Sequence, residues 1–99
     1  MDSKWHEEAV RELRAEVSWL EIQSSGLGVR LLVDVRNALR RIEEFPDLGS
    51  PRAQGCRWVL LSHFPFYLVY LVVEDQLIVL ALAHQRRRPG YWRSRAKLH

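Results

Sequence analysis

Two apolar runs follow each other in the second half of the chain: Phe66-Tyr67-Leu68-Val69-Tyr70-Leu71-Val72-Val73 and Leu77-Ile78-Val79-Leu80-Ala81-Leu82-Ala83. Both have the length of a strand, and the first is rich in β-branched and aromatic residues. The three residues between them, Glu74-Asp75-Gln76, suffice for a β-hairpin and are too few for a crossover to a parallel strand. The first run is apolar on both faces, which predicts a central strand that is covered on both sides.

A third β-rich run, over residues 56–63, precedes these two and is separated from them by Phe64-Pro65. Proline rarely continues a central strand, so this break predicts a second tight connection. Short connections between successive strands favour antiparallel neighbours. The sequence therefore predicts an antiparallel meander over residues 56–83.

The first half of the chain has the 3-4 spacing of amphipathic helices. One stripe predicts a helix over residues 4–23, with Asp2 or Ser3 as its N-cap. This stripe consists of Trp5, Ala9, Leu13, Val17 and Leu20. A second stripe predicts a helix that ends near Phe45, and it consists of Leu32, Val35, Leu39 and Ile42. A turn containing Gly26 joins the two helices, which predicts an antiparallel hairpin.

Together these elements predict an α+β fold, with one domain over residues 1–99. An N-terminal antiparallel helical hairpin is expected to pack on a C-terminal antiparallel β-meander of three to four strands. Apolar side chains that fall off the main helical stripes are expected to cover the sheet or to form an exposed patch for a partner. Three of them are assigned to the partner-binding patch: Trp19, Ile22 and Leu31.

The composition is that of a globular protein and excludes several functional classes. The net charge is +3, but residues 1–48 hold ten acidic and seven basic side chains, whereas residues 49–99 hold two and eight. No uncharged apolar stretch is long enough for a membrane span, and the first residues lack a signal-peptide core. The single cysteine, Cys56, has no partner for a disulfide, which indicates a reducing cytoplasm. The histidines are scattered, so no metal and no cofactor are predicted.

The candidate site follows the last apolar run, where His84-Gln85-Arg86-Arg87-Arg88-Pro89-Gly90-Tyr91-Trp92 combines arginines with two aromatic residues. In a meander, a further arginine on the first strand is expected to lie near this stretch. Metal-free RNA cleavage needs a proton carrier and fixed cations beside the phosphate. The candidate catalytic residues are therefore Arg57, His84, Arg86 and Tyr91.

Other interpretations of the same residues stay open. His84 also fits a strand-end histidine whose hydrogen bonds are satisfied, and Trp92 fits an aromatic clasp that closes the edge of the core. Tyr91, if neutral, only donates a hydrogen bond or orients a group. Because side chains alternate along a strand, at most two of the three successive arginines face the same way.

Three local motifs occur in the order and spacing of a known superfamily. The first is Gly26-Leu27-Gly28 followed by the second helical stripe and Glu44-Phe45-Pro46, which leads into the loop Phe45-Pro46-Asp47-Leu48-Gly49. The second is Phe64-Pro65-Phe66-Tyr67-Leu68-Val69-Tyr70, and the third is the terminal stretch 84–92. With these motifs, nearly the whole chain resembles the RelE/ParE superfamily, the toxins of type II toxin–antitoxin (plasmid stabilisation) systems. The resemblance implies a cytoplasmic toxin that needs no cofactor and forms a hetero-oligomer with a cognate antitoxin protein.

The chain departs from the superfamily pattern in two features, and the second indicates which branch of the superfamily the chain resembles. Members usually begin with a strand before the first helix; here so few residues precede the helical stripe that this strand is expected to be very short or missing. Members that cleave mRNA on the ribosome carry cations where this chain has Trp58, Leu60 and Tyr67. Arg86 and Tyr91 are retained. The chain therefore resembles the ParE-like branch more closely, whose members are associated with DNA gyrase.

The resemblance implies three alternative functions. The first, which we expect, is a ParE-like toxin that inhibits DNA gyrase and replication and is neutralised by an antitoxin. Its target-binding residues would be Arg86, Arg87, Arg88, Tyr91 and Arg93, and its antitoxin-binding residues Trp19, Ile22 and Leu31. The second is a RelE-like ribosome-dependent mRNA endoribonuclease, with the four candidate catalytic residues around the phosphate. The third is a non-toxic, degenerate binding module of the same fold.

Overall fold

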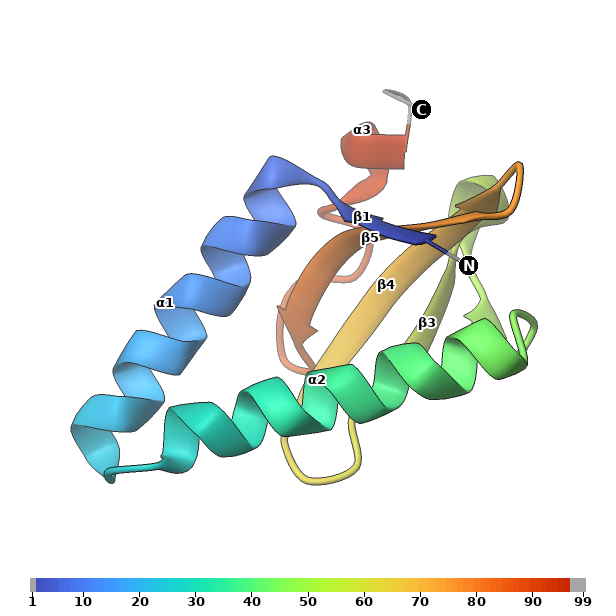
Figure 1. Ribbon diagram of the computed structural model, residues 1–99. Coiled ribbons are helices and arrows are strands. Elements are labelled where there is room, and N and C mark those ends of the chain that lie inside the picture. Colours follow the sequence, from blue (N-terminus) through green and yellow to red (C-terminus); the bar gives the residue numbers. More distant parts are fainter. Residues whose placement is uncertain (1, 97–99) are drawn as a thin grey trace.

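The computed structural model describes residues 2–96 and has two helices on one face of a twisted sheet (Figure 1). These helices are α1 (Glu7–Gln23) and α2 (Leu27–Glu44), and they diverge from their connecting turn. The short helix α3 (Arg93–Ala96) packs against the opposite face of the sheet. The strands are β1 (Asp2–Trp5), β2 (Ser50–Pro51), β3 (Arg57–Leu60), β4 (Phe66–Val73) and β5 (Gln76–His84). The predicted α+β class is confirmed.

Within residues 2–96 the sheet has five strands, in the order β1-β5-β4-β3-β2. The strands β3, β4 and β5 are successive antiparallel neighbours, which confirms the meander. Strand β1 adds a parallel neighbour to β5, from Asp2 opposite Gln76 to Trp5 opposite Val79. The strand that was expected to be very short or missing is therefore present, with four residues, and it covers the first part of the β5 edge.

The predicted start of the first helix is wrong. The helix begins at Glu7, and its N-cap is His6, whose Nδ1 accepts a hydrogen bond of 3.1 Å from the Glu8 amide. Trp5 belongs to β1 instead of the helical stripe. Pairing with β5 holds residues 2–5 in an extended conformation, and helical spacing does not detect a partner that lies so far along the chain.

The first strand of the meander is also shorter than predicted, since β3 covers only Arg57–Leu60 of the expected residues 56–63. The next residues turn toward β4, and the Leu61 amide donates to the Phe66 carbonyl at 2.9 Å. A side chain of α2 stabilises this turn. The Asp34 carboxylate, 2% exposed, accepts hydrogen bonds from the amides of Ser62 (3.3 Å) and His63 (2.8 Å).

The turn between α1 and α2 is tightened by Glu21. Its carboxylate accepts hydrogen bonds from the backbone amides of Gly26 at 3.1 Å and Gly28 at 2.8 Å, at the start of α2. The hydrogen bond from Gly26, and then that from Gly28, lower the pKa of Glu21. A Cβ atom on Gly28 would lie 2.8 Å from the Val17 carbonyl oxygen, so glycine is required for the close approach of the helices.

The buried face of α2 differs from the predicted stripe at two positions, where Leu31 and Ala38 are buried in place of Leu32 and Leu39. It includes Leu31, Val35, Ala38 and Ile42, which pack on the inner face of the sheet. Leu32 is 43% exposed, whereas Leu31 has no exposed surface. The assignment of Leu31 to an exposed partner-binding patch is therefore wrong, because its side chain is part of the core.

The outer face of the sheet is covered by the C-terminal segment. Trp92 is 2% exposed and, with Ala96, joins a buried cluster that contains Val69 and Leu80. The aromatic clasp predicted for Trp92 is confirmed. Because Tyr91 and the arginines flank this residue, the clasp also places the candidate site on the outer face of the sheet.

Candidate functional site

The arginine-rich stretch forms a turn at the end of β5, which we call the arginine turn (residues 84–89). The Arg87 amide donates to the His84 carbonyl at 2.8 Å. The side chains of Arg86, Arg87 and Arg88 are all exposed. Because these residues lie beyond the strand, the turn presents three guanidinium groups to solvent, where strand alternation predicted two at most on one face.

Aromatic rings on the outer face lie next to this turn. The rings of Trp58 and Tyr67 are stacked, with centroids 4.2 Å apart and an interplanar angle of 15°. The Arg52 guanidinium lies 3.8 Å from the centroid of the Trp58 ring, and that of Arg87 lies 4.1 Å from the centroid of the Tyr91 ring. Two of the three rings therefore carry a cation over their face, an arrangement stabilised by cation–π attraction. A small hollow is bordered by residues of this group: Trp58, Tyr67, His84, Arg87 and Tyr91.

Tyr91 is held by a carboxylate from the first helix. Its hydroxyl donates a hydrogen bond of 2.5 Å to Glu12 Oε2. Burial, followed by this hydrogen bond and the charge of Glu12, raises the pKa of Tyr91 well above its ordinary value. Tyr91 is therefore a neutral hydrogen-bond donor near pH 7, and its hydroxyl is already bound.

The same carboxylate binds Arg95 and the edge of β5. Glu12 Oε1 lies 2.8 Å from one Arg95 nitrogen and Oε2 lies 3.2 Å from the other. Arg95 also donates to the Leu80 carbonyl at 2.8 Å, and Glu12 Oε1 accepts from the Leu82 amide at 3.2 Å. These side chains satisfy the backbone of β5 beyond the end of β1. This cluster was not predicted, because Glu12 is one of several acids on α1 and its partners lie far along the chain.

The expected grouping of Arg57 with the C-terminal candidates does not form. Arg57 lies opposite Tyr70 on β4, whereas His84 lies opposite Phe66, toward the other end of that strand. The Arg57 guanidinium instead donates to the Gly49 carbonyl at 2.8 Å. Arg57 therefore holds the loop after α2, because its strand pairing directs it away from the arginine turn.

The alternative interpretation of His84 agrees with its contacts. Its Nδ1 accepts a hydrogen bond of 3.1 Å from the Arg86 amide, and its ring packs edge-on against Phe66 with centroids 5.5 Å apart. The hydrogen bond fixes the turn that follows the strand. His84 thus ends β5 and starts the arginine turn.

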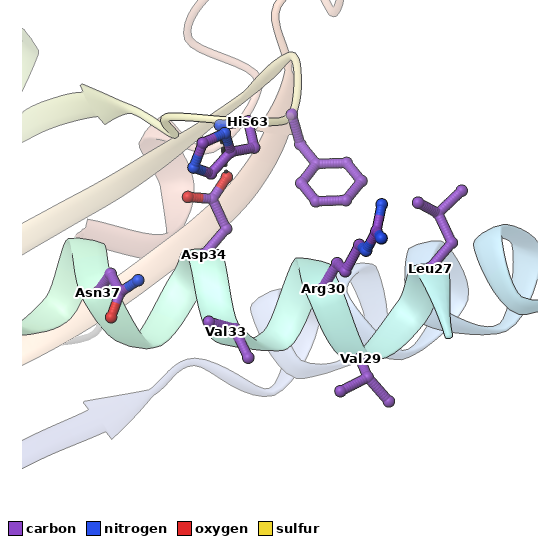
Figure 2. A pocket seen from close by; sticks show the side chains of 8 residues that line it. Leu27, Val29, Arg30, Val33, Asp34, Asn37 and His63 are labelled. Carbon is purple, nitrogen blue, oxygen red and sulfur yellow. Dashed lines mark hydrogen bonds between the residues drawn. The ribbon is translucent and has the colours of Figure 1, made fainter. Parts of the chain in front are cut away.

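The helices present a second candidate surface, which is apolar. Trp19 and Ile22 are 57% and 80% exposed, as expected, and α2 has three further exposed apolar residues: Val29, Leu32 and Val33. A groove of about 490 Å³ runs beside α2 near the β3–β4 turn. Figure 2 shows Asp34 pointing to His63, which it contacts at the border of this groove, with Arg30 and Leu27 on the same side of the helix.

A second hollow lies between α1 and the β3–β4 turn. It is lined by residues that include Trp19, Leu20, Phe64 and His84. Phe64 also lines the groove beside α2, so this residue borders both hollows. We call this combined region the helical groove surface. The sequence identified one of its exposed residues, Trp19, but it did not identify the groove, which depends on the position of the β3–β4 turn.

Neither a membrane helix nor a metal site is found in the part of the chain that the structure describes. No helix of residues 2–96 is long and apolar enough to cross a membrane. Among the same residues, no three His, Cys, Asp or Glu side chains are grouped so that they could hold a metal ion.

The arrangement of two helices on this sheet is shared with solved toxin structures. The chromosomal ParDE system from P. aeruginosa matches with a TM-score of 0.72 and 18% identity, over 85% of this chain and 95% of that chain. The intact E. coli RelBE toxin–antitoxin complex matches with a TM-score of 0.65 and 20% identity, over 87% and 98% of the two chains. The isolated E. coli RelE toxin matches with a TM-score of 0.64 and 18% identity, over 99% and 98%. At these identities the likeness shows the fold.

The sequence itself defines the family. The family described as "ParE toxin of type II toxin-antitoxin system, parDE" matches residues 3–89. Because the match covers most of the chain, the protein belongs to the ParE toxin family. A search of curated protein sequences found no match.

Proposed function

We propose that this protein is a ParE-like toxin that inhibits DNA gyrase in the cytoplasm and is neutralised by a cognate antitoxin. The family match supports the toxin class. The observation that carries the choice of branch is the outer face of the sheet. There, the rings of Trp58 and Tyr67 are stacked on each other, at positions where the superfamily resemblance implies cations in the mRNA-cleaving branch.

The contacts of the candidate catalytic residues favour binding over RNA cleavage. The Tyr91 hydroxyl is bound to Glu12, and Arg57 is bound to the loop after α2. A scissile phosphate at the arginine turn would therefore lack a converging set of cations and proton carriers. The exposed guanidinium groups of Arg86, Arg87 and Arg88 are well suited to bind acidic groups of a protein target.

The helical groove surface is the proposed antitoxin site. Its exposed apolar residues, which include Trp19 and Val33, would be covered by apolar side chains of an antitoxin segment. Arg30 lines the groove and would pair with an acidic residue of that segment. A toxin–antitoxin hetero-oligomer follows from such an interface. His84 lines the second hollow and also begins the arginine turn, so the two proposed sites adjoin at this residue.

Gyrase supercoiling of relaxed plasmid, measured with increasing amounts of the purified protein, tests the proposed target. We expect supercoiling to be inhibited, and inhibition to be relieved by the cognate antitoxin. Unchanged supercoiling at a large molar excess of the protein would contradict a gyrase target.

A separate experiment tests the ribonuclease alternative. Primer extension on translated mRNA, after the protein is induced in bacteria, should show no cleavage within codons. Cleavage there would favour the RelE-like alternative. If induction did not arrest growth, both toxin functions would be contradicted and a non-toxic binding module would be favoured.

A further inference from the structure

We infer that Glu12 is a positioning residue for the proposed target-binding surface. It holds the Tyr91 hydroxyl and the Arg95 guanidinium, and thereby fixes the ring on which the Arg87 guanidinium rests. The inference rests on the proposed function, because the surface that Glu12 positions is the one assigned there to the target. Glu12 itself would not touch the target.

The contacts of Glu12 join three separate segments of the chain. Both carboxylate oxygens are used, one by Arg95 and the Leu82 amide, and the other by Arg95 and Tyr91. The side chains of Glu12 and Arg95 are only 16% and 12% exposed. A bidentate, largely buried ion pair has a defined geometry, unlike the ion pairs of exposed side chains.

Glu12 affects the arginine turn through the Tyr91 ring, which contacts both Glu12 and Arg87. The hydroxyl end of this ring is fixed by Glu12 at 2.5 Å. Its face carries the Arg87 guanidinium at 4.1 Å from the centroid, and the Arg95 guanidinium lies 5.1 Å from the same centroid. Arg87 is otherwise an exposed side chain with many rotamers, so the fixed ring reduces the entropy that binding would cost.

Strand β5 extends beyond β1, so side chains have to bind its backbone groups in this last part. The last backbone bond from the N-terminal segment reaches Val79, where the His6 amide donates to its carbonyl at 2.9 Å. The next carbonyl on the outer edge is that of Leu80, which Arg95 binds, and the next amide is that of Leu82, which Glu12 binds. The ion pair thus takes the place of a neighbouring strand in the stretch that leads into the arginine turn.

The position of Arg87 can be measured without any target. A proton near the face of an aromatic ring is shifted upfield, so the Arg87 Hε resonance reports contact with Tyr91. Its assignment comes from the signal that disappears in Arg87→Ala, and the exposed Arg36 Hε serves as the reference. We expect an upfield displacement in the wild type and loss of most of it in both Glu12→Gln and Tyr91→Phe. The second variant keeps the ring and removes only the tethering hydroxyl. Tyr67→Phe, which removes a hydroxyl from a neighbouring ring, should leave the displacement unchanged.

The effect on function is measured as inhibition of purified gyrase by the same folded variants. We expect about tenfold more protein to be needed for half-inhibition with Tyr91→Phe, on the scale of a lost hydrogen bond to a charged group. An Arg87 displacement that persists in folded Tyr91→Phe would overturn the inference. So would a lost displacement with unchanged inhibition. If the wild-type protein left gyrase unaffected, the proposed target would fail, and the inference would fail with it only if the displacement also persisted in Tyr91→Phe.

Discussion

The Tyr91 hydroxyl donates a hydrogen bond of 2.5 Å to Glu12 Oε2, although the two residues are 79 positions apart in the chain. This contact ties the first helix to the segment that covers the outer face of the sheet. Removing the hydroxyl in Tyr91→Phe keeps the ring but takes a donor from a largely buried carboxylate. We expect the free energy of unfolding in urea to fall by about 1.5 kcal/mol. An unchanged urea midpoint would contradict a structural role for this bond.

The same contact predicts a pH dependence. Burial and Glu12 raise the pKa of Tyr91 in the folded protein. A raised pKa means that the folded state favours the neutral phenol, so its contribution to stability is complete below the unfolded pKa of about 10 and is lost as the pH rises further. Between pH 9 and pH 11 (about one unit on either side of that pKa), the wild type should therefore lose more stability than Tyr91→Phe. Parallel losses in the two proteins, measured by urea unfolding, would argue against this assignment.

The clasp on the outer face predicts a large effect of Trp92→Ala. The ring is 2% exposed and packs on the buried cluster of the outer face. Its removal should lower the free energy of unfolding by about 3–5 kcal/mol. Arg86→Ala, in the exposed turn nearby, should weaken growth arrest while leaving the melting temperature nearly unchanged. A melting curve for Trp92→Ala that matched the wild type would show that the ring does not close the core.

Two neighbouring leucines on α2 provide a matched test of the core. Leu31 is fully buried and Leu32 is 43% exposed. Leu31→Ala should cost about 2–5 kcal/mol of stability, and Leu32→Ala much less. Similar losses for the two variants in thermal or urea unfolding would mean that the helix is rotated relative to the arrangement described above.

The turn between β3 and β4 depends on Asp34. Its carboxylate accepts from the amides of Ser62 and His63, so Asp34→Ala leaves two donors without their partner. We expect a loss of about 2 kcal/mol in urea unfolding. Asp47→Ala, which removes an exposed carboxylate, is the control and should change stability little. If both substitutions had equally small effects, Asp34 would not be what holds this turn.

Local sequence patterns predicted the helical hairpin, the meander and the buried Trp92. These patterns did not predict which face of α2 is buried, because two overlapping stripes of apolar residues fit the same helix. In α2, both the predicted and the observed stripes contain Val35 and Ile42, and only packing on the sheet selects Leu31 and Ala38 over the alternatives. Ala38 on the buried face is small and only weakly apolar, so it contributes little to a helical pattern of apolar residues.

The candidate site was predicted less well than the fold, for a physical reason. The arginine turn is local in sequence and was recognised, whereas the position of Arg57 depended on strand register. The roles of Glu12 and Asp34 depend on contacts with backbone amides that are 70 and 28 positions away. Spacing along one helix does not report such contacts, and a buried acid and a solvated one look alike in the sequence.

The arginine turn is the proposed binding site for gyrase. The most direct test compares inhibition of gyrase supercoiling by wild type, Arg87→Ala and Arg36→Ala, all confirmed to be folded by circular dichroism. Arg36 is an exposed arginine on α2, so its removal changes the net charge equally but leaves the outer face intact. We predict that Arg87→Ala inhibits much more weakly than the other two proteins. Equal inhibition by all three would contradict the claim.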